Sequence, residues 1–213
     1  MLKTTTLLSA LALAAVTGTA MAQSETTTPA TDAEQTTDET TAAPAADPTL
    51  DTGTPDEPQV GQGYVREEIG DWQLQCVKQE DPATEPCQMY QLLRGAENNP
   101  VAEVIIEKLP DGGQVAAGAT IAVPLGTALS KDLRIAVDGG KGKVYRYAFC
   151  DSNSCYARIG LLEADIAAFK KGNAANVVLF PYEAQDQPVE LKMSLSGFTA
   201  GYEATRPAQP PQQ

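Results

Sequence analysis

The chain of 213 residues contains no histidine. Without an imidazole, no Ser-His-Asp or Cys-His nucleophile system and no histidine-containing metal site can be built. Lysine and arginine form no cluster with interleaved aromatic residues, so the sequence favours neither nucleic acid nor an anionic membrane surface as a partner. Aromatic residues make up only 6% of the chain, and its single tryptophan is Trp72. These absences remove several classes of enzyme and ligand and assign no activity.

Catalysis by carboxylates alone remains open after these exclusions. Glu103, Glu107, Asp138 and Asp151 could in principle supply an acid and a base for a carboxylate-dependent hydrolase. Each falls on a predicted polar strand face or in a predicted turn, where a carboxylate is usually solvated. We therefore predict no catalytic residue, no cofactor and no metal site, and we expect that the chain is not an enzyme.

Residues 1–22 have the three parts of an export signal. Lys3 supplies the positive charge, a short apolar stretch follows, and Ala20-Met21-Ala22 forms a small-residue cleavage site. The apolar stretch breaks at Thr17, short of the roughly 20 residues that a membrane-spanning helix needs. We expect cleavage after Ala22 and no transmembrane segment in the cleaved protein.

Residues 23–63 are dominated by Thr, Ala, Pro, Asp and Glu, with nine acidic residues and no lysine or arginine. Such a segment has almost no large apolar side chain to bury, so it cannot offset the entropy lost on ordering. We predict a disordered acidic linker. Its composition favours a solubilising tail, and a spacer that reaches across the envelope is the alternative.

Residues 64–204 have the length of one folded domain, and we predict that residues 205–213 form a disordered Pro/Gln-rich tail. Alternating apolar and polar residues, separated by turn residues, predict short strands. The predicted strands are 71–78, 87–93, 102–107, 119–123, 133–137, 143–149, 176–182 and 189–195. Trp72 shares the inward face of the first with Leu74 and Cys76, whereas the inner side of 87–93 is ambiguous. This pattern favours a mainly β, antiparallel, sandwich-like single domain.

One segment, 162–171, has helical spacing. Leu162, Ile166 and Phe169 recur on one face, acidic residues lie in the first turn and lysines in the last. Gly172 follows as a C-terminal stop. We predict one short helix that covers a sheet face or closes one end of the fold.

The four cysteines lie in two close pairs, Cys76 with Cys87 and Cys150 with Cys155. Four cysteines allow three pairings, and the nearest-neighbour pairing is favoured because each disulfide then closes a single turn region. Disulfides persist in an oxidising compartment, which agrees with export. A zinc site would need thiolates in a reducing compartment, and a redox pair would need the closer C-x-x-C spacing, so we predict structural disulfides.

An ordered series of short motifs runs through the globular region. The series is Gly70-Asp71-Trp72, Cys76, Cys87, Val123-Pro124-Leu125-Gly126, Leu133 through Val137-Asp138-Gly139-Gly140, Phe149-Cys150, Cys155, and Ser194-Leu195-Ser196-Gly197-Phe198-Thr199-Ala200. In this order and with these cysteines, the chain resembles the invasion-associated locus B family. The resemblance implies a β-rich domain in the periplasm or outer envelope of a Gram-negative bacterium, or secreted from it. It transfers no catalytic residue, since most members have no established biochemical activity.

The combined expectation is an exported, non-enzymatic interaction module whose partner is an envelope protein or a cell-surface component. The family takes its name from a locus linked to entry into host red cells, so the resemblance allows a role in host-cell invasion. A structural or stress-protective envelope component without a defined ligand is the alternative, with the carboxylate hydrolase after it. An exposed cluster of Tyr145, Tyr147, Phe149 and Tyr156 would favour protein binding, although residue type favours core packing for these aromatic side chains.

Overall fold

The structure is a computed structural model that describes residues 53–110 and 113–207. The predicted export signal and most of both the predicted linker and the predicted tail lie outside the described residues. In the described part of the linker, the Gly61 amide donates a hydrogen bond to the Lys78 carbonyl, so the chain contacts the domain before the first strand begins. No helix in the described part is long and apolar enough to cross a membrane.

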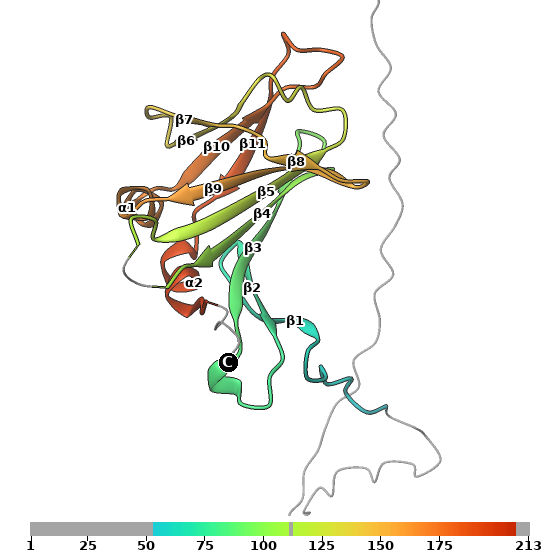
Figure 1. The fold of residues 1–213 in the computed structure, drawn as a ribbon, viewed down its shortest axis with the longest axis vertical. Coiled ribbons are helices and arrows are strands. Elements are labelled where there is room, and N and C mark those ends of the chain that lie inside the picture. The colour runs from blue at the N-terminus through green and yellow to red at the C-terminus, as the bar shows by residue number, and fades with distance from the viewer. Residues whose placement is uncertain (1–52, 111–112, 208–213) are drawn as a thin grey trace, which may run out of the picture. The chain divides into compact units, whose positions relative to one another are not determined.

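Two antiparallel sheets form the domain, and the expected mainly β fold is confirmed (Figure 1). The larger sheet has the order β1 (Gly63–Ile69), β2 (Trp72–Val77), β3 (Cys87–Arg94), β4 (Pro100–Lys108), β5 (Ala117–Pro124), β9 (Ser154–Leu161), β8 (Phe149–Cys150). The smaller sheet has the order β11 (Val189–Ser194), β10 (Ala174–Leu179), β6 (Leu133–Val137), β7 (Lys143–Tyr145). In the larger sheet, β1 to β5 lie side by side in chain order. In the smaller sheet, β10 pairs with β11 and β6 pairs with β7.

The core lies between the inner faces of the two sheets because the strands alternate as period two requires. In β5, Ala117, Ala119, Ile121 and Val123 are buried, and the residues between them are not. The same alternation buries Met89 at 0% exposure on β3. Each large aliphatic side chain removed from water in this way contributes roughly 1.5–3 kcal/mol to folding.

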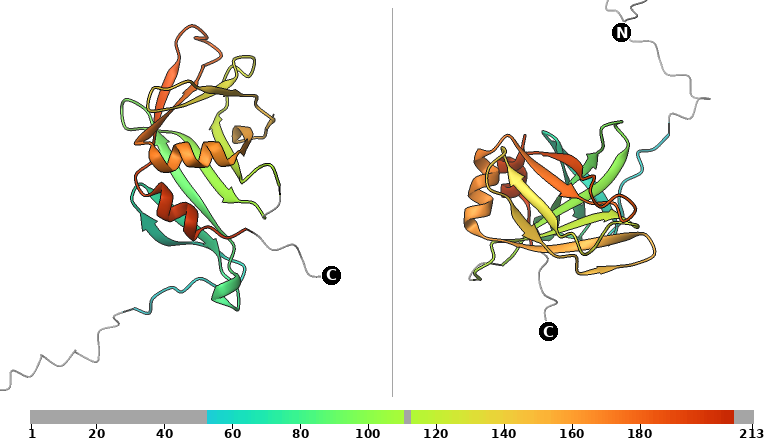
Figure 2. Two further views of the ribbon diagram at one scale, coloured as in Figure 1. Left: turned by 90° about the vertical axis from the view of Figure 1, so that its left-hand side faces the viewer. Right: turned by 90° about the horizontal axis from the view of Figure 1, so that it is seen from above.

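Two helices cover the part of the larger sheet's inner face that the smaller sheet leaves open (Figure 2, left). α1 (Glu163–Lys171) is the predicted helix, and it buries Ile166 and Phe169. α2 (Phe198–Ala204) is a second helix that the sequence pattern did not predict. It contains Gly201, which disfavours helix in isolation but fits here because an added Cβ would lie 2.8 Å from the Met89 Cε atom.

Two strands, β1 and β9, also were not predicted, and the predicted strand 143–149 is divided between the sheets. β7 pairs with β6 in the smaller sheet, whereas β8 pairs with β9 in the larger one. The chain therefore crosses from one sheet to the other between Tyr145 and Phe149. Tyr145 and Tyr147 on this crossing pack against the core, which is the expectation from residue type, but Phe149 is 51% exposed.

The two sheets are joined at one corner by the turn before β2 and the end of β11. The Trp72 indole Nε1 donates to the Ser194 carbonyl at 3.0 Å, and the Gln91 amide both donates to that carbonyl and accepts from the Ser194 amide. These bonds explain why Gln91, a polar residue, faces inward at 6% exposure, and they settle which side of β3 is inner. Trp72 itself is 1% exposed, as its strand face predicts.

Candidate functional site

The outer face of the larger sheet is the surface on which side chains from the most strands meet. One cross-strand row consists of successive neighbours on β3, β4, β5, β9 and β8: Leu92, Glu103, Ala122, Tyr156 and Phe149. A second row runs beside it from β2 to β9: Gln73, Tyr90, Ile105, Thr120 and Arg158. Neither α1 nor α2 covers these rows, because both helices pack on the opposite face.

A groove of about 520 Å³ follows the first row between β3 and the tip of the β8–β9 hairpin. Its walls are mainly apolar and include Leu92, Ile105 and Pro124. Glu103 is the charged residue of the groove, and Tyr156 closes one end. Small side chains on β5, such as Ala122, leave the hollow open. The groove therefore combines aliphatic walls, an aromatic ring and one carboxylate.

The Glu103 carboxylate helps to raise the pKa of two nearby tyrosines, Tyr90 and Tyr156. Burial raises the pKa of Tyr90, and after it the negative charge of Glu103 and the hydrogen bond that the Tyr90 hydroxyl donates to the Glu103 carboxylate. The pKa of Tyr156 is raised first by its hydrogen bond to Asp151, and the charge of Glu103 adds to this. The described residues provide no salt bridge to Glu103.

The tip of the β8–β9 hairpin is rigid. A disulfide joins Cys150 to Cys155, and Asp151 accepts hydrogen bonds from the amides of Asn153 and Ser154. These amide hydrogen bonds lower the pKa of Asp151. On the strand side, the rings of Phe149 and Tyr156 stack with 4.9 Å between centroids. Asp151 therefore acts as a turn-forming residue, and the stacked pair is held at the surface.

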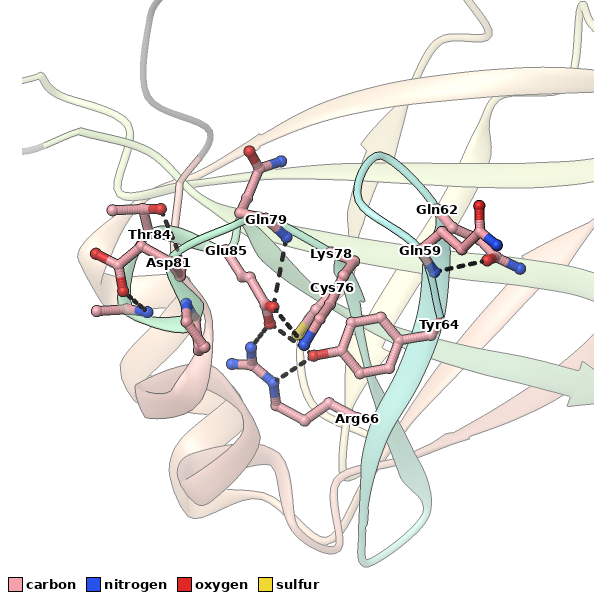
Figure 3. Close-up of polar contacts among 12 residues, drawn as sticks. Gln59, Gln62, Tyr64, Arg66, Cys76, Lys78, Gln79, Asp81, Thr84 and Glu85 are labelled. Atoms are coloured by element: carbon pink, nitrogen blue, oxygen red, sulfur yellow. Dashed lines mark hydrogen bonds and ion pairs between the residues drawn. The ribbon is translucent and has the colours of Figure 1, made fainter. Parts of the chain in front are cut away.

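The densest charged cluster surrounds Glu85, which sequence reasoning did not single out (Figure 3). Its carboxylate is fully buried, forms ion pairs with Arg66 and with Lys78, and accepts a hydrogen bond from the Tyr64 hydroxyl at 2.6 Å. Arg66 also donates to that hydroxyl at 3.1 Å. Burying a carboxylate is tolerated only when its oxygens are paired in this way.

The Glu85 cluster fastens the loop that the other disulfide, Cys76–Cys87, closes. The Arg206 guanidinium also holds this loop, since it donates to the carbonyls of Pro82 and Ala83 at 3.0 Å each. Since its partners occupy both oxygens of Glu85, this carboxylate stabilises the loop and is not an available acid or base. Nothing in the sequence distinguished it, because it is one of 28 acidic residues.

The four carboxylates considered as an acid and a base do not converge. Glu103 and Glu107 lie on the outer face of β4, whereas Asp138 lies in the β6–β7 turn of the other sheet. Asp138 accepts hydrogen bonds from the amides of Asn173 and Ala174, which lower its pKa. In the described part of the chain, no three or more Cys, Asp or Glu side chains are grouped so that they could hold a metal ion.

Comparison with known proteins bears directly on this arrangement. The family profile described as "Invasion associated locus B (IalB) protein" matches residues 72–206. The chain belongs to this family. The invasion-associated locus B match begins at Trp72 and ends at Arg206, so it spans both disulfides, the outer-face groove and the Glu85 loop.

A solved structure supports the same assignment. The crystal structure of invasion associated protein B from Bartonella henselae is similar with a TM-score of 0.54 and 25% sequence identity, over 64% of this chain and 91% of that one. No curated protein sequence matches. The invasion-associated locus B family is associated with the envelope of Gram-negative bacteria, and two disulfides fit an exported protein.

Proposed function

We propose that this chain is an exported envelope protein that binds another protein or a cell-surface component and catalyses no reaction. The outer face of the larger sheet carries the proposal. It presents exposed or half-buried side chains from β2, β3, β4, β5, β8 and β9, and the described helices leave it uncovered. Half-buried aromatic and aliphatic residues grouped on one face are a common mark of an interaction surface.

The free edges of the larger sheet offer a poorer surface for binding than its outer face. β1 has a bulge between Val65 and Glu67 and carries three successive charged residues, and both features discourage pairing with another strand. β8 at the opposite edge has two residues. We therefore assign binding to side chains of the face, and not to strand addition at an edge.

Site-specific photo-crosslinking in the bacterium that produces the protein tests this function. A benzophenone amino acid replaces Thr120, at the centre of the outer face, or Lys192, on the exposed side of β11 in the other sheet. We expect an adduct of defined mass from position 120 and none from position 192. The cross-linked protein should be in the envelope fraction and begin at Gln23.

Two results would contradict the function. One is the absence of an adduct at position 120 in every envelope fraction. The other is equal adduct formation at positions 120 and 192, which would indicate random collision.

A further inference from the structure

The chemistry of the outer-face groove indicates what kind of group it accepts. Glu103 lies between Leu92 and Ala122 in its cross-strand row, and Ile105 follows it on the same face of β4. A carboxylate flanked by aliphatic side chains attracts a cation and offers apolar surface to the chain that carries it. Ion pairs inside the described chain engage Glu85, Asp165 and Glu203 and leave this carboxylate without a basic partner.

We propose that the groove binds a lysine or arginine side chain carried by an extended segment of a protein partner. The proposal rests on the proposed binding function and narrows it to a partner chemistry. The aliphatic stem of the bound residue lies along Leu92 and Ile105, and its charged end reaches Glu103. The ring of Tyr156 at the end of the groove, with Tyr90 in the neighbouring row, provides aromatic faces of the kind that attract cations.

The dimensions of the surface favour a peptide segment over a single amine. A second hollow, of about 460 Å³, shares Leu92 with the groove and continues along the ends of β2 and β3 to Arg94 and Glu68. The two hollows together are lined by residues from β2 to β9, five adjacent strands spaced about 4.8 Å apart, so they extend further than one side chain reaches. A segment that places a basic residue at Glu103 can therefore continue over Gln73 and Tyr90, two polar residues of the neighbouring row.

The rigid hairpin tip explains how such a surface could bind without a large entropic cost. The Cys150–Cys155 disulfide and the Asp151 hydrogen bonds fix Tyr156 and Phe149 before a partner arrives. A binding surface that is already ordered loses little conformational freedom on association.

Titration followed by NMR tests the proposal on the chain from residue 23 to residue 213. The probe is the peptide acetyl-Thr-Leu-Lys-Val-Thr-amide, and its counterpart has uncharged norleucine in place of lysine. We expect the lysine peptide to shift the amide signals of Leu92, Ala122 and Tyr156. We expect the norleucine peptide to bind about tenfold more weakly, a difference of about 1.4 kcal/mol, because it cannot form the charge pair with Glu103.

Two variants on one strand face provide the matched comparison. Glu103→Gln should abolish the preference for lysine, whereas Glu107→Gln, four residues along β4 and outside the groove, should retain it. Equal affinity of the wild-type chain for both peptides would overturn the proposal, as would equal loss of preference in both variants. A photo-adduct at position 120 together with no lysine preference would leave the binding function standing and refute the groove's specificity. A lysine preference without any adduct would refute the binding function alone.

Discussion

Gly197 and Gly126 have almost the same backbone conformation and very different surroundings. Their φ angles are +82° and +84°, in the left-handed region that disfavours other residues. A Cβ on Gly197 would lie 2.0 Å from the Ile69 carbonyl oxygen, whereas nothing lies within 4 Å of a Cβ on Gly126. Gly197 therefore permits the close approach of the turn before β2 to the start of α2.

This contrast makes a prediction about stability. Gly126→Ala should lower the free energy of unfolding by about 1–2 kcal/mol, the usual cost of left-handed backbone for an L-residue. Gly197→Ala should lower it by more than about 3 kcal/mol, because the backbone of two elements must also separate. Urea unfolding of the two oxidised variants measures the difference. Equal losses would show that the corner between the sheets is loosely packed.

Among individual residues, the disulfide pairing could be predicted from the sequence, whereas the ion-pair and hydrogen-bond partners of buried polar residues could not. The spacing of the cysteines favoured the two disulfides that the structure contains. Glu85 and Gln91 could not be found this way, since their roles depend on Arg66 and Ser194, which approach only when the chain is folded. The groove around Glu103 depends likewise on four strands meeting in register.

Among the elements, the joint between the sheets depends most on Trp72. Its indole donates to Ser194 on β11, and its ring meets the Phe198 ring of α2 edge to face with 5.7 Å between centroids. Trp72 thus connects β2 to the smaller sheet and to a helix. Loss of this side chain would open a cavity where three elements meet.

We expect Trp72→Ala to lower the free energy of unfolding by about 3–5 kcal/mol. Trp72→Phe keeps an aromatic ring and loses the indole donor, while Gln91 still donates to the Ser194 carbonyl. Apart from the effect of the smaller ring, the lost hydrogen bond should lower the free energy of unfolding by about 1 kcal/mol. The wild-type chain should show blue-shifted tryptophan fluorescence that moves to the red on unfolding. A Trp72→Ala chain that unfolds at the wild-type urea concentration would refute this role.

The elements that the sequence pattern predicted are those with clear periodicity. Strands at 71–78, 133–137 and 189–195 and the helix at 162–171 match β2, β6, β11 and α1 closely. β9 was missed although its alternation is regular, since every second residue from Cys155 to Leu161 is buried and Arg158 and Gly160 face outward. α2 was missed because Gly201 weakens its helical signal. The division of 143–149 between two sheets is a tertiary effect, since both halves have the local pattern of strand.

For the whole molecule, the lack of histidine shapes the dependence of stability on pH. No side chain with an ordinary pKa titrates between about pH 5 and 8, so the free energy of unfolding should be nearly constant there. The pKa values of Asp138 and Asp151 are lowered by backbone hydrogen bonds. These two carboxylates therefore stabilise the folded protein at pH values above their pKa in the unfolded chain. This stabilisation is lost as pH falls through their lower pKa values in the folded protein.

At alkaline pH the free energy of unfolding falls as pH rises, and the main contribution to this fall comes from Tyr147. Burial raises the pKa of Tyr147 to about 12, so the unfolded chain releases this proton first, from about pH 10. The corresponding stability is present below about pH 10 and is lost as pH rises toward 12. The Tyr147 hydroxyl is buried and has no hydrogen-bond partner in the described part of the chain.

Tyr147→Phe should therefore leave stability at pH 7 unchanged or slightly higher, because it removes a buried hydroxyl that forms no bond. It should also reduce the loss of stability between pH 8 and 11, whereas Tyr182→Phe, at a tyrosine that is 68% exposed, should not. Urea midpoints across this pH range measure both effects. A Tyr147→Phe chain destabilised at pH 7, with an unchanged alkaline limb, would mean that the hydroxyl has a partner in the folded protein, and that the crossing between the sheets is fastened by that bond and not by packing alone.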